Sequence, residues 1–365
     1  MIDGSEAETL ELSIAGGVGR RYVRALVGMK RGGLMTDSEY DRKMRQELST
    51  YEQNVNVHEL PAIFHYWSNT HIRPLCEAAG FSAIDEFFAT HLMQSADHAA
   101  AARPRFLSVG AGNCDTEVAI ATRLRQCGYR EFTIQCIEIN PAMLQRGQDL
   151  AAEQGVLDCL QFTRADFNTW VAPTSYDGIM ANQSLHHVTQ LEHLFDQVRR
   201  ALRDGARMVI SDIIGRNGHQ RWPESLALVH HFWKELPKRR RFNLLLNRHE
   251  ELYENWDCSS EGFEGVRAQD ILPLLLERFH CEKFVAFGSA IDVFVDRCFG
   301  HHFDPASGAD RDFIDRVHRA DEEGFASGTL TPTHMFGVFG SEPVPQPYAA
   351  RGLTAAAAVR AVPAR

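Results

Sequence analysis

Hydrophobic residues recur at helical spacing through the first part of the chain and form short runs after residue 104. Over 37–96 the apolar positions follow the period of amphipathic helices, as in ELPAIFHYWSNTHIRPLCEAAG. From Arg105 onward, short apolar runs such as RFLSVG alternate with amphipathic segments such as CDTEVAIATRLRQCG. The first pattern predicts a helical cap over 16–104, and the second predicts strands that alternate with helices.

The alternating part predicts five strands before residue 213, in RFLSVG, FTIQCIEI, LQFTRAD, YDGIMAN and ARMVISD. Strand–helix–strand connections of this kind build a parallel sheet with helices on both faces. CEKFVAFG resumes the pattern, and PTHMFGVFG follows as a last strand that can run antiparallel beside it. We therefore expect an α/β fold with a doubly wound, seven-stranded, mostly parallel sheet over 105–340. A helical insertion at 213–268 and a second insertion at 289–331 interrupt it.

The two ends of the chain differ from this pattern. Residues 1–15 and the tail at 341–365 contain few large apolar residues, and the tail is rich in proline and alanine. Segments of this composition bury too little apolar surface to offset the entropy that ordering costs. We therefore expect both ends to be flexible.

The overall composition narrows the functional classes. The chain has 365 residues, of which 44% are hydrophobic and 24% charged, and its net charge of −10 differs from the basic surplus of nucleic-acid binders. No stretch is long and apolar enough for a membrane span, and the acidic start lacks the features of a secretory signal. The eight cysteines form no CxxC pair, which indicates reduced thiols in a cytoplasmic protein. We expect neither nucleic acid nor a membrane as partner, and a homodimer is left open.

The first predicted strand ends in a glycine turn, FLSVGAGNCDTEV, at 106–118. Ligands of open α/β sheets bind at the carboxyl ends of strands, and Gly110 and Gly112 let the backbone approach a ligand there. A dinucleotide fingerprint needs a third glycine three residues after the second, but this chain has Asp115. Its carboxylate would repel a pyrophosphate, which counts against NAD and FAD. A cofactor without phosphate and with a cationic amino-acid end would tolerate it.

Two later strands end in further carboxylates. Glu138 ends the second predicted strand and can accept hydrogen bonds from both hydroxyls of a ribose, each worth roughly 1.5–3 kcal/mol. Both NAD and S-adenosylmethionine carry such a ribose, so Glu138 alone does not separate them. Asp166 and Phe167 end the third strand. The aspartate can accept from an adenine amino group, whereas Phe167 can flank the adenine or belong to the core.

Taken in order, five segments resemble the class I, Rossmann-like methyltransferases that depend on S-adenosylmethionine. They are LSVGAGNCDTEV, CIEINPAML, TRADF, YDGIMANQSLHHV and LRDGARMVISD. The resemblance covers 105–212, and the last two strands extend it to about 340. The cofactor contacts that it implies are Gly110 and Gly112 (methionine-side turn), Glu138 (ribose), Asp166 (adenine) and Asn182 (near the methyl group).

One position departs from the family. Ser108 stands where members often have an acidic residue that contacts the amino group of the cofactor. Asp115 or a water molecule would then make this contact.

Methyl transfer requires that the protein align the acceptor and, for a hydroxyl, remove a proton. His186 and His187 follow the fourth predicted strand, beside the expected methyl site, and the ordinary pKa of histidine lies near neutrality. Each can act as a general base, or can cap or pack at the start of the next helix. Because neighbouring side chains point in different directions, we expect at most one of the two to be the base.

Two other histidine pairs, at 230–231 and 301–302, raise the question of a metal. Adjacent residues on a helix point about 100° apart, and the chain has no HExxH motif. We therefore expect no metal.

The leading hypothesis is a methyltransferase that acts on an oxygen or nitrogen of a small molecule, with an acceptor pocket built by the N-terminal helices and the insertions. The basic segment at 238–241 can receive an anionic or carrier-bound acceptor, or can be a solvated surface. Two alternatives stay open. An NAD-dependent oxidoreductase or epimerase is opposed by Asp115 and by the lack of a Tyr-x-x-x-Lys motif. The other is a non-catalytic scaffold that binds the cofactor.

Overall fold

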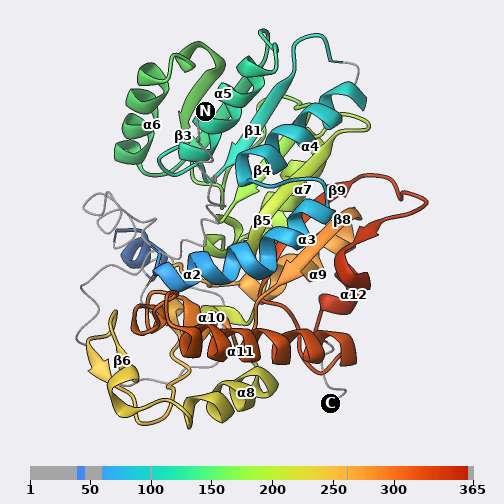
Figure 1. Ribbon diagram of the computed structural model, residues 1–365. Helices are drawn as coiled ribbons and strands as arrows, with labels where there is room; N and C mark the ends of the chain where they lie inside the picture. Colours follow the sequence, from blue (N-terminus) through green and yellow to red (C-terminus); the bar gives the residue numbers. More distant parts are fainter. Residues whose placement is uncertain (1–38, 46–59, 99–100, 261, 361–365) are drawn as a thin grey trace, which may run out of the picture.

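The computed structural model describes residues 39–45, 60–98, 101–260 and 262–360. Its central feature is an eight-stranded sheet with the order β10-β8-β9-β5-β4-β1-β2-β3 (Figure 1). The strands are β1 (Arg105–Val109), β2 (Thr133–Glu138), β3 (Leu160–Arg164), β4 (Gly178–Asn182), β5 (Arg207–Ile213), β8 (His280–Phe287), β9 (His334–Gly340) and β10 (Tyr348–Ala349).

The strand directions confirm the doubly wound, mostly parallel sheet. β1 pairs in parallel with β2 and β4, β2 pairs with β3, and β4 pairs with β5. β9 inserts between β5 and β8 and is antiparallel to both, as predicted for the last long strand. All residues of β9 are buried, which fits a central strand covered on both faces.

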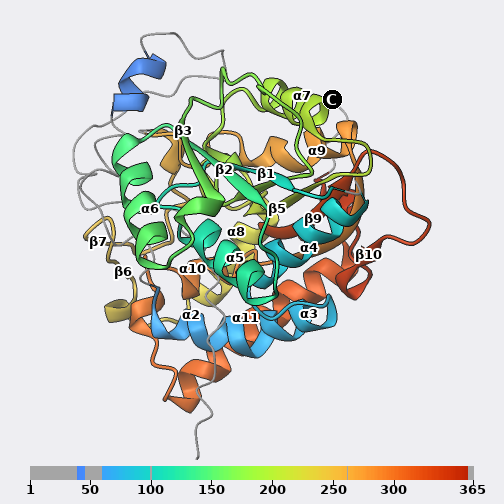
Figure 2. The same ribbon diagram turned by 90° about the horizontal axis from the view of Figure 1, so that it is seen from above.

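Successive side chains of the strands point to opposite faces, and each face carries its own apolar cluster. Phe106 belongs to one cluster, and the neighbouring Leu107 belongs to the other. Figure 2 shows the helices as two layers on either side of the sheet. One layer contains α4 (Ile84–His98), α5 (Asp115–Gln126) and α6 (Pro141–Glu153), and the other contains α7 (Leu191–Ala201), α9 (Ala268–Arg278) and α12 (Ala355–Ala358).

The N-terminal part is helical where it is described. Residues 39–45 form a short helix, and α2 (Ala62–Trp67) leads through a π-helical turn into α3 (Arg73–Ala78). The predicted flexible segment at 1–15 lies outside the described residues.

The two insertions lie together at the lower end of the molecule in Figure 1. The first follows β5 and the second follows β8, and Arg240 of the first pairs with Asp310 of the second at 2.7 Å. Tyr66 of α2 donates a hydrogen bond of 3.1 Å to Asp315 of the second insertion. Their elements are α8 (Pro223–Trp233), β6 (Phe242–Asn243), β7 (Arg248–His249), α10 (Asp292–Val295) and α11 (Gly308–Ser327).

The tail differs from the flexible segment that the sequence predicts at 341–365. Residues 348–349 form β10, which pairs in parallel with β8, and Ala350, Ala355 and Ala358 are buried. Small alanine side chains fit closely against the sheet edge, so this segment packs without large apolar residues. Residues 361–365 lie outside the described part.

No helix within the described residues is both long and apolar enough to cross a membrane.

Candidate active site

The glycine turn after β1 forms as predicted. Gly110 and Gly112 have φ values of +71° and +55°, a region that favours glycine. A Cβ atom on Gly110 would lie 2.5 Å from the Cβ of Ser184, so the turn also lies against the loop after β4. This contact brings the two loops together at the carboxyl edge of the sheet.

Glu138 lies beside the turn, at the end of the neighbouring strand β2. Its Oε2 accepts a hydrogen bond of 3.1 Å from the backbone N–H of Gly112, and its Oε1 accepts from the N–H groups of Ile139 and Asn140 at 2.8 and 3.0 Å. The residue is only 8% exposed. Glu138 therefore shapes the turn in addition to the ribose contact predicted for it.

Asp166 follows β3, the next strand in the sheet. Its Oδ1 accepts from the backbone and side chain of Asn168 at 2.9 and 3.1 Å, and its Oδ2 accepts from the hydroxyl of Tyr40 at 2.6 Å. Burial, followed by the contact with Asp166, raises the pKa of Tyr40, so this phenol donates at neutral pH. Phe167 is 9% exposed and belongs to an apolar cluster, which is the core alternative.

The amino-acid end of the predicted cofactor site contains two buried side-chain oxygens without a hydrogen-bond donor within the described residues. Asn182 ends β4 and donates to Thr116 at 3.0 Å, but its Oδ1 has no hydrogen-bond partner within the described residues. Glu117 lies in the first turn of α5, where its Oε1 accepts from Ser108 at 2.6 Å and its Oε2 has no such partner. Burial raises the pKa of Glu117 to about 7.

Glu117 was not among the site residues predicted from the sequence. Its carboxylate, which accepts from Ser108 of β1, belongs to helix α5 and not to the strand itself. Asp115, which was predicted to contact the amino group of the cofactor, is exposed at the first position of α5. The helical period could have indicated Glu117, because a residue two positions after the exposed Asp115 lies on the opposite side of the helix, toward the sheet.

A second cluster of polar groups lies in the loop after β4. His186 is fully buried, and its Nδ1 lies 2.6 Å from Oδ1 of Asp212 in β5. Asp212 is also buried and accepts N–H bonds from Ser184, Leu185 and Ile213. Because an ionised carboxylate only accepts, His186 carries a hydrogen on Nδ1 and directs Nε2 away from Asp212.

Glu264, from the first insertion, joins three histidines. Its Oε1 lies 2.5 Å from Nε2 of His219 and 3.5 Å from Nε2 of His186, and its Oε2 lies 3.6 Å from Nε2 of His187. His186 and His187 were expected to point in different directions, yet both imidazoles reach this carboxylate. The ring centroids of the two lie 4.3 Å apart.

The buried charges shift the pKa values of this cluster. Burial lowers the pKa of His186, but Asp212 and then Glu264 outweigh it and raise that pKa to about 10. Burial also lowers the pKa of His219, with partial compensation from Glu264. Burial alone would raise the pKa of Glu264, but the histidines, His187 first, hold it well below its ordinary value. These shifts do not favour His186 as the general base.

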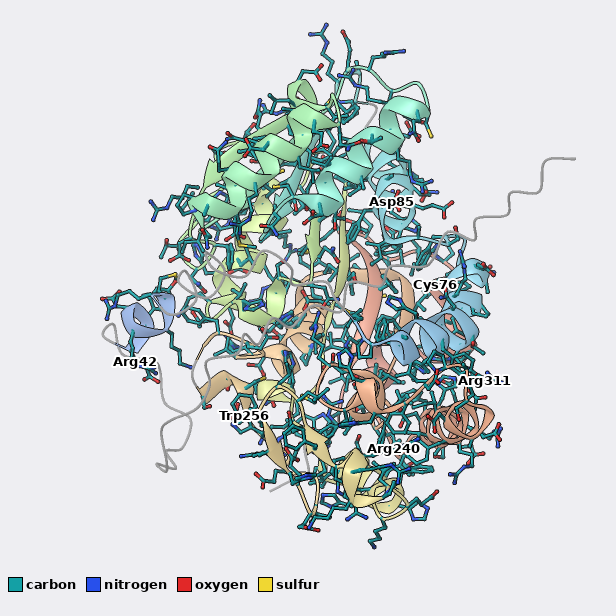
Figure 3. All side chains as sticks on the ribbon, turned by 60° about the vertical axis from the view of Figure 1, so that its left-hand side comes forward. Arg42, Cys76, Asp85, Arg240, Trp256 and Arg311 are labelled. Carbon is teal, nitrogen blue, oxygen red and sulfur yellow. The ribbon has the colours of Figure 1, made fainter. Side chains whose placement is uncertain are left out.

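A cavity of about 150 Å³ adjoins this cluster. His219 and Glu264 line it, and much of the remaining wall is apolar, with Phe64 of α2 and Val293 of α10 among its residues. Trp256 of the first insertion also lines the cavity. In Figure 3 it lies on the same side of the molecule as Arg42, which belongs to the helix at 39–45. The N-terminal cap and both insertions therefore contribute to one cavity.

The helix at 39–45 connects the predicted adenine position with the insertion. Tyr40 contacts Asp166, and its ring centroid lies 5.3 Å from that of Phe263, the neighbour of Glu264 in the chain. Lys43 is buried and donates to the carbonyl of Ser259 at 2.7 Å.

The basic segment at 238–241 is largely engaged in contacts within the protein. Lys238 pairs with Glu251 at 2.9 Å, and Arg240 pairs with buried Asp310 at 2.7 Å. Arg241 donates to backbone carbonyls, including that of Leu236 at 2.9 Å. The exposed Lys238 agrees with the alternative of a solvated surface, whereas Arg240 and Arg241 make contacts within the protein that neither alternative predicted.

Comparison with known proteins agrees with the fold of the part of the chain that carries the glycine turn. The family described as "Methyltransferase domain" matches residues 106–205. The chain is 30% identical over 111 residues to 27-O-demethylrifamycin SV methyltransferase of Amycolatopsis mediterranei (strain S699), across 30% of this chain and 39% of that protein. It is 28% identical over 163 residues to methyltransferase GfsG of Streptomyces halstedii, across 44% of this chain and 52% of that protein. The matched parts therefore span only about half or less of these curated relatives.

Among solved structures, the geranyl diphosphate C-methyltransferase from Streptomyces coelicolor A3(2) is 16% identical, with a TM-score of 0.38 over 70% of this chain and 77% of that one. At this score the likeness carries no argument about the acceptor. The family match and the strand order together identify the part of the chain around residues 106–205 as a class I methyltransferase domain of the family that depends on S-adenosylmethionine.

Proposed function

We propose that this protein transfers the methyl group of S-adenosylmethionine to a hydroxyl oxygen of a small molecule held in the cavity. The observation that carries this proposal is the hydrogen bond of 2.5 Å between His219 and Glu264 at the cavity wall. The loop of His186 connects this pair to the glycine turn, because Ser184 packs against Gly110 and donates to the carbonyl of Val109 at 2.6 Å. An acceptor in the cavity would thus have a proton acceptor and a cofactor turn close by.

The residues at the carboxyl edge fit this cofactor. Oδ1 of Asn182 and Oε2 of Glu117 have no hydrogen-bond partner within the described residues, and both can accept from an ammonium group. When bound, S-adenosylmethionine supplies a methyl group that is already activated on a sulfonium. The protein then has to align the acceptor and exclude water, and positioning of this kind supplies up to roughly 7–11 kcal/mol.

The proton of the acceptor hydroxyl can move to His219. Because ionised Glu264 only accepts, His219 carries its hydrogen on Nε2 and has a lone pair on Nδ1, which has no partner within the described residues. When Nδ1 takes the proton, Glu264 stabilises the imidazolium, as the aspartate does in a Ser–His–Asp triad. The O–H and S–CH3 bonds break while the O–CH3 bond forms, and the sulfur keeps its bonding electron pair.

His186 then acts as a positioning residue. It lies between Asp212 and Glu264, at 2.6 and 3.5 Å, and is fully buried, so it orients Glu264 rather than contacting the acceptor.

A hydroxyl acceptor agrees better with this cluster than an amine, which has only to bind in its deprotonated form. The name of the relative from Amycolatopsis mediterranei refers to an O-demethylated acceptor, and we extend an oxygen acceptor to this chain. The cavity wall supports an acceptor with an apolar body. The pairing of Lys238 and Arg240 with carboxylates gives no support to an anionic or carrier-bound acceptor.

The test is incubation of the full chain with isotopically labelled S-adenosylmethionine and a panel of hydroxylated, amine-bearing and carbon-nucleophile acceptors. We expect label on oxygen, assigned by mass spectrometry and NMR, and little turnover in Glu264→Gln. Label on nitrogen or carbon would overturn the oxygen assignment. Calorimetric titration with S-adenosylhomocysteine and with NAD provides the second arm, in which tight binding of NAD alone would overturn the methyltransferase assignment.

A further inference from the structure

Three side chains beside the cavity are arranged as metal ligands. His186, His219 and Glu264 each offer one ligand atom, and these atoms lie within 4.8 Å of one another. Two imidazoles and one carboxylate form a ligand set that first-row transition metals accept, with the remaining coordination positions open. The sequence did not reveal this group, because its members come from three separate segments with no motif spacing.

The first independent observation is the environment of the two ring nitrogens of His186. Its Nε2 is fully buried, lies 3.5 Å from Glu264, and makes no hydrogen bond within the described residues. Its Nδ1 is held by Asp212 at 2.6 Å, and Asp212 is itself held by three backbone N–H groups. A carboxylate behind the histidine in this way fixes the ring and its tautomer, as it does in protein metal sites.

The second observation is the charge of the cluster. Asp212 and Glu264 are both buried, and within the described residues their ion pairs are with histidines rather than with arginine or lysine. Burying two carboxylates requires positive charge nearby, which protons on the histidines or a cation can provide. A metal ion would thus compete with the protons for the same site.

One of the distances between the ligand atoms already equals that of a metal site. Ligands about 2.1 Å from a tetrahedral metal lie about 3.4 Å from one another, and Nε2 of His186 lies 3.5 Å from Oε1 of Glu264. His219 is closer to Glu264, at 2.5 Å, so a metal would have to separate that hydrogen-bonded pair by about 1 Å. His219 belongs to a partly buried turn and lines the cavity.

We propose that His186, His219 and Glu264 bind a divalent transition metal such as Zn²⁺ or Co²⁺, and that the bound metal inhibits methyl transfer. Nitrogen ligands disfavour Mg²⁺ and Ca²⁺, which prefer oxygen. Binding itself does not depend on the proposed function, whereas the inhibition rests on it, because the metal would engage the pair that accepts the proton of the acceptor.

The direct test is titration of the chelator-treated full chain with Co²⁺ alone, followed by visible absorption, and with Zn²⁺ alone in a calorimeter. We expect one ion per chain and the absorption bands of a nitrogen- and oxygen-ligated Co²⁺. His219→Ala and Glu264→Gln should each weaken binding at least tenfold. His231→Ala removes an exposed histidine of α8 and is the matched control, which should bind as the wild type does.

Circular dichroism of both ligand variants shows whether they remain folded, and the near-isosteric Glu264→Gln keeps the test informative if His219→Ala does not fold. Absence of the Co²⁺ bands, or unchanged binding in folded Glu264→Gln, would overturn the metal site. Once an acceptor is in hand, Zn²⁺ should reduce turnover at least tenfold at saturation, and stimulation by Zn²⁺ would overturn the inhibitory role. Methyl transfer without metal binding contradicts only this inference, and metal binding without methyl transfer contradicts only the proposed function.

Discussion

The proposed cofactor region, at the ends of β1 to β4, and the proposed acceptor region, around His219 and Glu264, meet at the same edge of the sheet, but they are built in different ways. The predicted cofactor residues end four strands, β1 to β4, that are neighbours in the sheet and follow one another in the chain. The acceptor cluster joins His186 after β4, His219 after β5 and Glu264 near the end of the same insertion. The first region is therefore encoded locally, strand by strand, whereas the second exists only after the insertions fold over the sheet.

The largest effect should come from the acceptor side. We expect His219→Ala to lower turnover by roughly 10²–10⁴-fold, the range for loss of a general base, while the affinity for S-adenosylhomocysteine changes little. The reason is that His219 lines the cavity and bonds to Glu264 but, within the part of the chain that the structure describes, makes no hydrogen bond or ion pair with the glycine turn. Steady-state kinetics and calorimetry on the same preparation separate the two quantities. If the affinity for S-adenosylhomocysteine fell as much as the turnover, His219 would contribute to cofactor binding as well as to the acceptor region.

A buried histidine outside the site provides the contrast. His91 in α4 is 5% exposed, and burial, followed by nearby Lys283, lowers its pKa to about 4. Between about pH 6.5 and 4 the unfolded chain binds a proton there and the folded chain does not, so stability is lost as the pH falls through this window. Relative to His91→Gln, the wild type should lose about 2 kcal/mol between pH 6.5 and 4.5.

Denaturant unfolding of both proteins at several pH values measures this difference. His91→Gln should leave turnover unchanged, because α4 packs in one apolar cluster whereas Leu185 and Val188, which flank His186 and His187 in the chain, belong to the other. A pH-independent difference in stability would place His91 in a more exposed or charged environment.

On the cofactor side, substitution of Glu138 should have the largest effect. We expect Glu138→Ala to weaken S-adenosylhomocysteine binding at least tenfold, through loss of the ribose contact and of the support for the turn at Gly112. Glu138 accepts three backbone N–H bonds, so the variant should also melt at a lower temperature than the wild type. Removal of a residue that contacted only the cofactor would leave the melting temperature unchanged. Glu138→Gln is the control that keeps the size and one acceptor oxygen. Unchanged affinity in Glu138→Ala would remove this residue from the site.

These differences explain which parts could be predicted from the sequence. Apolar periodicity and turn residues are local, so the strand order, the antiparallel last strand and the carboxyl-edge positions of Gly110, Glu138 and Asp166 follow from short segments. Glu264 and His219 have no such local signature, since their meeting depends on the path of a long insertion. The β10 edge strand was also missed, because backbone pairing with β8 stabilises a segment that is poor in large apolar side chains.

Tyr40 tests whether the two regions communicate. Its hydroxyl donates to Asp166, and its ring contacts Phe263, next to Glu264. We expect Tyr40→Phe to weaken S-adenosylhomocysteine binding by about three- to tenfold, less than the loss of a full charge-assisted hydrogen bond, because Asn168 still holds Asp166. Calorimetry gives the affinity, and Tyr66→Phe, which removes a hydroxyl from α2, is the control. An effect on turnover without an effect on affinity would assign Tyr40 to the acceptor side.

The smallest effect should come from the basic segment. Lys238 forms an exposed pair with Glu251, their side chains being 72% and 74% exposed, whereas two residues later Arg240 holds the buried carboxylate of Asp310. Solvent screens the first pair, so Lys238→Ala should leave the melting temperature and the turnover of every acceptor within error of the wild type. Arg240→Ala should lower the melting temperature, because it leaves a buried charge unpaired. Thermal unfolding and acceptor kinetics on both variants decide the matter. If Lys238→Ala instead raised the KM of an anionic acceptor while a neutral acceptor was unaffected, the segment would belong to the acceptor region, and that region would extend to the outer surface of the insertion.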